Sequence, residues 1–191
     1  MDDGIHMRVE SAYSYKDALG HKLQAEPGFT TDGASIPRGL WTLVGSPFTG
    51  KYRNAAVIHD VGCVSHKYSW QITHLMFYSA MIDSGVENGQ ALLFYFAVRL
   101  RGPRWERGSA EAKTIAELKR EIGDTPIIGK IEEKPAPGIS GGGKIYVAHF
   151  YREFPVGDIG QAQLESFRKE IQEREQSGHP ITTDEIDQRS R

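Results

Sequence analysis

Residues 53–60 read RNAAVIHD, and Gly62 and Cys63 follow closely. The small and apolar residues of this run favour a helix that packs closely against a neighbour. The run ends in His59 and Asp60, so such a helix carries two ionisable side chains toward an interior. Burying such groups is costly unless they are paired or bind a metal. We therefore expect His59 and Asp60 to belong to the functional site of the protein.

The composition is that of a globular protein with no global charge bias. The 191 residues suffice for one domain with an extension or for two small units. The net charge of −2 gives no strong nucleic-acid signal. The single cysteine excludes an internal disulfide.

The sequence shows neither an apolar leader nor a long apolar run. The start, Met1 to Gly4, is acidic, and the apolar run at 91–98 is too short to span a bilayer. We therefore expect synthesis in the cytoplasm without a signal peptide and no transmembrane segment.

The order of patterns predicts an α+β fold with a small N-terminal β element, a central helical core that holds the His-Asp helix, and a C-terminal strand-helix extension. Strand patterns at 7–10 and 22–25 flank a turn. Helical spacing predicts helices over 51–63, 70–84 and 88–100, and a fourth that begins at Ser109 and stops before Gly123.

The predicted domain organisation has four parts. Residues 1–131 form the main domain, and the Pro- and Gly-rich residues 132–143 form a linker. Residues 144–176 form the strand-helix extension, and 177–191 form a polar tail. This tail has too little apolar content to offset its ordering entropy, so we expect it to be disordered in isolation. Its deletion should leave the melting temperature nearly unchanged.

Three chemical interpretations of His59 remain open. His59 can be a general base held by a partner on the next helix, with Asp60 holding a cation. Alternatively, His59, Cys63, His66 and His74 form a zinc site, because residues four apart share a helix face. In the third interpretation, His59 activates a Cys63 thiolate nucleophile. The non-catalytic alternative is a buried hydrogen-bonded His-Asp pair that joins two helices.

Two further residues, Asp32 and His74, are candidates for the same site. Asp32 lies in a turn whose carboxylate and backbone groups can supply oxygen ligands to a hard cation. The same turn can equally be an Asx-turn that caps its own backbone. His74 lies on the apolar stripe of the 70–84 segment, where a satisfied core histidine is the ordinary interpretation. Its interest comes from its expected proximity to His59.

Several blocks of the chain together resemble the domain of unknown function 1353 family, which is common in phages and prophages. The resemblance covers about residues 8–105 and implies a phage-derived, virion-associated protein. The blocks are FTTDGASIP at 29–37, Trp41, AAVIHD at 55–60, FYSAM at 77–81 and AVR at 97–99.

The layout is also similar to that of bacterial phospholipase A2. That resemblance implies that His59 activates water and that Asp60, with a loop near Asp32, holds calcium. The chain departs at two positions from the pattern of the domain of unknown function 1353 family. It has His74 where the family usually has aspartate, and Cys63 where it usually has tyrosine. A histidine partner does not stabilise an imidazolium as a carboxylate does.

The leading functional prediction is a metal-assisted ester hydrolase. Its catalytic residues are His59, Asp60 and His74, and its metal ligands for calcium or zinc are Asp60, Asp32 and Cys63. The alternative is a non-catalytic phage structural or assembly protein whose His-Asp pair is architectural. In that case the C-terminal extension binds a virion or host protein.

Overall fold

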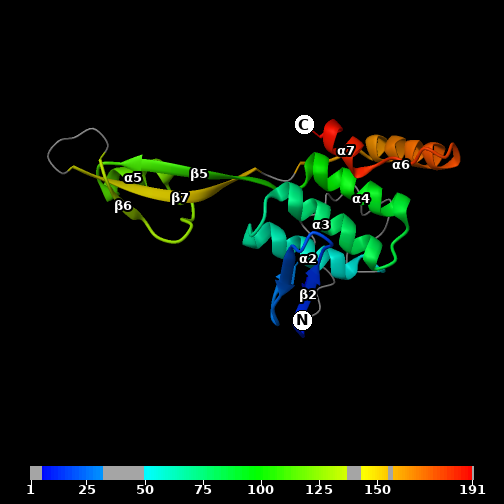
Figure 1. Ribbon diagram of the computed structural model, residues 1–191, viewed down its shortest axis with the longest axis horizontal. Coiled ribbons are helices and arrows are strands. Elements are labelled where there is room, and N and C mark those ends of the chain that lie inside the picture. The colour runs from blue at the N-terminus through cyan, green and yellow to red at the C-terminus, as the bar shows by residue number, and fades with distance from the viewer. Residues whose placement is uncertain (1–5, 32–49, 137–142, 155–156, 191) are drawn as a thin grey trace. The chain divides into compact units, whose positions relative to one another are not determined.

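The computed structural model describes residues 6–31, 50–136, 143–154 and 157–190. The fold is α+β, as predicted, with N-terminal strands, a central set of helices and a C-terminal strand followed by helices (Figure 1). The chain divides into two compact units. The first comprises residues 1–103 with 155–191, and the second comprises residues 104–154.

Short antiparallel pairs begin the first unit. Strand β1 (Met7–Arg8) pairs with β4 (Thr30–Thr31), and β2 (Tyr13–Lys16) pairs with β3 (Lys22–Ala25). Gly20, with a φ of 91°, forms the turn between β2 and β3. The pattern predicted β1 and β3 but not their partners β4 and β2.

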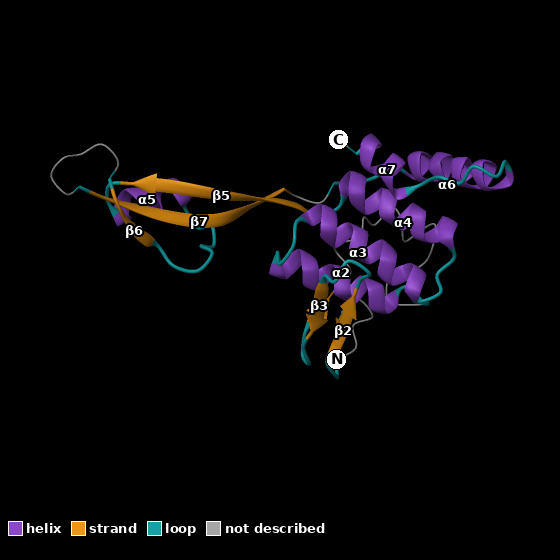
Figure 2. Ribbon diagram, viewed as in Figure 1, coloured by secondary structure: helices purple, strands orange, loops and turns teal. Residues whose placement is uncertain are grey.

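Three helices form the core of this unit, close to the predicted bounds: α2 (Arg53–Ser65), α3 (Trp70–Asp83) and α4 (Asn88–Arg101). Helix α2 packs on β3 and α3, and α3 packs on α4 (Figure 2). The small residues of α2 permit this approach. A Cβ added at Gly62 would lie closer than 3.0 Å to Thr73 Cγ2 on α3.

Helices α6 (Gln161–Gln176) and α7 (Thr183–Arg189) both pack on α4. Helix α6 buries Leu164, Phe167 and Ile171, as its apolar spacing predicts. The expectation of a disordered tail is wrong for the described residues 177–190. Ile181 and Ile186 are buried in the main core, so the tail adds apolar contacts that its composition does not suggest.

The second unit is a three-stranded antiparallel sheet with one packed helix (Figure 2). Its elements are β5 (Arg104–Ala112), α5 (Ile115–Ile122), β6 (Glu132–Pro135) and β7 (Lys144–Phe154), and β7 lies between the other strands. Helix α5 packs Leu118 and Ile122 against Ala110 and Ala148.

Two sequence expectations differ from this second unit. A helix does not begin at Ser109, because β5 continues through Ala112 in pairing with β7 and the cap of α5 is Thr114. The division of the chain follows Pro103 rather than residue 131, and β6 occupies the start of the expected linker 132–143. Residues 137–142 of that linker lie outside the described residues. In the described parts of the chain, no helix combines the length and the apolar character that a bilayer crossing requires.

Candidate functional site

The site is built where α2 and α3 pack together. Helix α2 carries His59 and Cys63 one turn apart, so both side chains leave the same face of the helix. Helix α3 contributes His74. Both imidazoles are fully buried, and Cys63 is only 8% exposed. The His59 and His74 ring centroids are 5.0 Å apart.

These three side chains form a compact set of metal-ligand atoms. Within the described residues, one nitrogen from each histidine and the Cys63 sulfur all lie within 4.8 Å of one another. Cys63 Sγ is 3.8 Å from His59 Nε2. A tetrahedral zinc ion, with Zn–N bonds of about 2.0–2.1 Å and a Zn–S bond of about 2.3 Å, holds its ligand atoms about 3.5 Å apart. Small side-chain movements therefore suffice to reach that geometry.

The surroundings keep His59 neutral. Burial removes the imidazole from water, and this desolvation lowers the His59 pKa from 6.5 to about 3. The ring also packs against Phe77 with a centroid separation of 4.7 Å. A neutral imidazole offers a nitrogen lone pair to a metal, whereas such a low pKa gives little affinity for a proton.

Asp60 lies beside this cluster and links α2 to the N-terminal strands. Thr31 Oγ1, at the end of β4, donates a hydrogen bond to Asp60 Oδ2. The other carboxylate oxygen, Oδ1, is 3.9 Å from His59 Nδ1. Asp60 is only 5% exposed. The carboxylate therefore holds β4 and lies next to the His59 ring.

The structure brings together most but not all of the residues proposed from the sequence. His59, Cys63 and His74 meet, and Asp60 is adjacent. His66 does not join this group of three. It ends α2 in the left-handed conformation, with a φ of 48°, and the change of direction ends the helical register. Asp32 and Gly33 lie outside the described residues.

Three residues at or near the site had no role in the sequence prediction. Thr31 contacts Asp60 across 29 residues of chain, and local spacing carries no signal for such a pair. Trp70 packs against His74 with ring centroids 5.5 Å apart, and Arg99 lies over the Trp70 ring. The position of Trp70, four residues before His74, is the one local signal for this contact.

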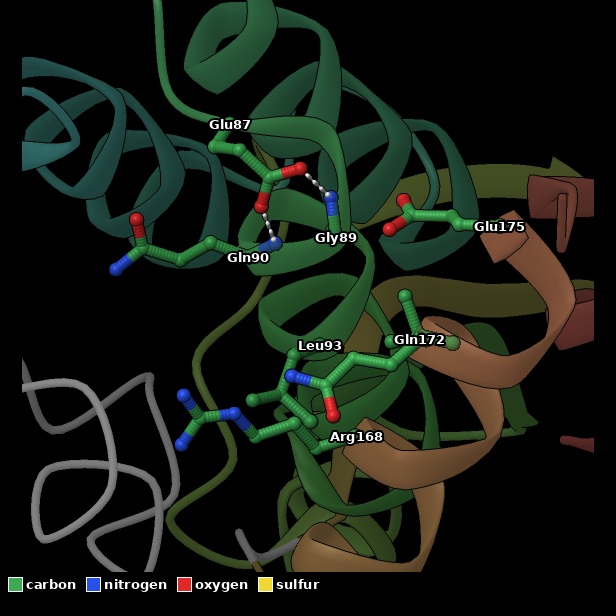
Figure 3. A pocket seen from close by; sticks show the side chains of 8 residues that line it. Glu87, Gly89, Gln90, Leu93, Arg168, Gln172 and Glu175 are labelled. Carbon is green, nitrogen blue, oxygen red and sulfur yellow. Dashed lines mark hydrogen bonds between the residues drawn. The ribbon is translucent and has the colours of Figure 1, made fainter.

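A separate groove lies between the N-terminal end of α4 and α6 (Figure 3). It has a volume of about 500 Å³ and shares no residue with the histidine cluster. Figure 3 shows the Glu87 carboxylate at its rim, where it accepts hydrogen bonds from the backbone amides of Gly89 and Gln90. This bond set caps α4, so Glu87 has a structural role here. The groove is lined by Glu87, Gly89, Gln90, Leu93, Arg168, Ile171, Gln172 and Glu175.

Comparison with known proteins identifies the family. Residues 7–98 match the family described as "Protein of unknown function (DUF1353)". The chain is 30% identical to the uncharacterized protein y4iH of Sinorhizobium fredii (strain NBRC 101917 / NGR234), over 96% of this chain and 70% of that protein. The uncharacterized protein y4jT of the same strain is 38% identical over 58% of this chain and 32% of its own length. No solved structure matches. The chain belongs to the DUF1353 family, and the matched region contains the whole histidine cluster.

Proposed function

We propose that this DUF1353 protein binds a divalent transition-metal ion through His59, Cys63 and His74, and that the bound ion activates water for hydrolysis. The observation that carries the proposal is the buried group of three ligand atoms within 4.8 Å. His59, Cys63 and His74 would hold the ion, and three protein ligands would leave room for a bound water, as in catalytic zinc sites. The chemistry that zinc would supply there is a lowered pKa of that water.

The donor set favours zinc over calcium. Two imidazole nitrogens and one thiolate sulfur are ligands typical of zinc, whereas calcium prefers six to eight oxygen atoms. The phospholipase-like alternative uses His59 as the base and Asp60 with Asp32 as calcium ligands. The buried, neutral state of His59 suits a ligand better than a base.

Asp60 has a supporting role in this proposal. Histidines that bind zinc commonly donate their second ring N–H to a carboxylate. With His59 Nε2 directed at the metal, Nδ1 faces Asp60 Oδ1 at 3.9 Å. A hydrogen bond between them would require this separation to shorten to about 2.9 Å.

The test is metal analysis of the purified full-length chain, followed by titration of the metal-free protein with Co²⁺ and Zn²⁺. We expect one ion per chain and a thiolate-to-cobalt absorption band. Cys63→Ser should remove that band, and His74→Ala should weaken binding. The matched control is His66→Asn, which removes an imidazole seven residues from His59 while asparagine tolerates the left-handed backbone. If His66→Asn and Cys63→Ser behave alike, or if neither ion binds, the proposed ligand set is wrong.

Hydrolysis is tested on the metal-loaded protein with ester substrates of increasing acyl length. We expect turnover that chelation abolishes and zinc restores. Bound metal without turnover would assign the ion a structural role. Phage origin, synthesis in the cytoplasm and virion association stay predictions of the resemblance and of the sequence.

The second candidate function is that of a non-catalytic assembly protein. In it the His-Asp pair is architectural, and the C-terminal extension binds a partner. The observation in its favour is the Thr31–Asp60 bond, which joins β4 to α2. In this case His59→Ala should lower the free energy of unfolding by about 1–3 kcal/mol, because a buried polar neighbour loses its partner. The same loss should then occur in the presence and in the absence of zinc.

A further inference from the structure

A continuous series of contacts leads from His74 to the C-terminal helix α7. Trp70 lies one turn before His74 on α3, and the two rings meet edge to face with centroids 5.5 Å apart. On α4, the Arg99 guanidinium carbon lies 4.5 Å from the centre of the Trp70 ring. Asp187 on α7 then contacts Arg99, with 2.7 Å between Asp187 Oδ1 and Arg99 Nε.

Asp187 fixes the position of the guanidinium. Arg99 is only 4% exposed, and a buried cation needs a charged partner to offset its desolvation. The same Asp187 oxygen accepts a hydrogen bond of 2.7 Å from the Tyr95 hydroxyl, one turn before Arg99 on α4. One carboxylate on α7 thus holds two side chains of α4 in place.

The guanidinium in turn restrains the indole. A cation over the face of Trp is attracted by the ring quadrupole, and the attraction is strongest where water is excluded. With its face held by Arg99, Trp70 presents its ring to His74 at an interplanar angle of 64°. The His74 ring contacts both the Trp70 ring and the His59 ring, so the tilt of Trp70 limits the directions in which His74 can point.

We propose that Trp70, Arg99 and Asp187 are positioning residues that orient the His74 ring toward the metal, so that the contact of Asp187 on α7 with Arg99 on α4 sets the metal affinity of the site. The inference rests on the proposed metal-binding function and adds its regulation. Residues that contact a metal-binding histidine without binding the metal themselves typically govern the metal affinity by fixing the orientation of the ring. Asp187 lies outside the family match at 7–98, so the C-terminal part of the chain supplies this contact.

The test compares Asp187→Asn with Glu170→Gln in the full chain. Asp187→Asn keeps the side-chain size but removes the charge that pairs with Arg99. Glu170→Gln is the matched control, because it breaks the 2.6 Å ion pair between Arg189 of α7 and Glu170 of α6 and leaves the Asp187 contacts intact. Two readouts are used: the Co²⁺ affinity with its absorption spectrum, and the NMR resonances of the His74 ring in metal-free protein.

For Asp187→Asn we expect about tenfold weaker Co²⁺ binding, the lower end of the effect seen when groups behind a metal ligand are changed. We also expect shifted His74 ring resonances, whereas Glu170→Gln should change neither readout. Arg99→Lys provides a second variant that keeps the charge and loses the planar fork, and it should shift the same resonances. Equal affinities and unchanged His74 resonances in Asp187→Asn and Arg99→Lys would overturn the positioning role. If the unaltered protein binds no metal, the proposed function fails, and the His74 resonances of the three variants still decide the positioning role.

Discussion

His59 and His74 come from different helices, yet their imidazole rings lie 5.0 Å apart and are both fully buried. The predicted convergence of these two histidines, made from the polar positions of two apolar helices, is therefore confirmed. Two buried imidazoles beside a buried thiol form a ligand set for a metal that accepts nitrogen and sulfur. The same arrangement offers no carboxylate on α3 opposite His59, since that place is occupied by His74.

The first prediction concerns chemical protection of Cys63. Zinc binding should slow alkylation of this thiol, because a coordinated sulfur is not free to attack a reagent. The rate of modification by a small alkylating reagent, followed by mass spectrometry, measures the effect. Zinc should protect and a chelator should restore the metal-free rate. Equal rates with and without zinc would argue against Cys63 as a ligand, and protection by calcium would favour the oxygen-ligand alternative.

The second prediction concerns the contact of α2 with α3. Gly62→Ala should lower the free energy of unfolding by about 1–3 kcal/mol, because the new methyl group overlaps Thr73 Cγ2. Urea unfolding measures the loss. Thr73→Ser removes that methyl group, so the double variant should recover part of the stability. If the effects of the two substitutions on the free energy of unfolding are strictly additive, α2 and α3 relieve the overlap by moving apart.

The main helices could be predicted because their signals are local. The apolar spacing of α2, α3, α4 and α6 lies within each segment. Strand β5 was missed because Ser109 has the chemistry of a helix cap, while pairing with β7 depends on residues about forty positions away. His59 and Cys63 are four residues apart on one helix, whereas Thr31, Arg99 and Asp187 reach the site only through the tertiary fold.

The third prediction reverses the expectation drawn from the composition of the tail. Deleting residues 177–191 should lower the melting temperature strongly, because Ile181 and Ile186 leave the core and Arg99 loses Asp187. Removing one partner of a buried ion pair typically costs about 3–5 kcal/mol. Thermal unfolding followed by circular dichroism measures the change. The double variant Ile181→Ser with Ile186→Ser serves as a comparison that keeps the chain length. A melting temperature equal to that of the intact chain would show that α7 is not part of the fold.

The fourth prediction concerns acid sensitivity of the α6–α7 contact. A hydrogen bond from Arg189 lowers the pKa of Glu170 below its usual value. The folded protein thus favours the ionised Glu170 carboxylate. The contribution of its ion pair with Arg189 to stability is therefore fully present above the pKa that glutamate has in the unfolded chain. It is lost as the pH falls through the lower folded pKa. Glu170→Gln should therefore be less stable than the intact chain at neutral pH, and the difference should shrink as the solution is acidified. Both proteins are compared by urea unfolding across the acidic range at one salt concentration. A difference that stays constant with pH would show that the ionisation of Glu170 does not stabilise the docking of α7.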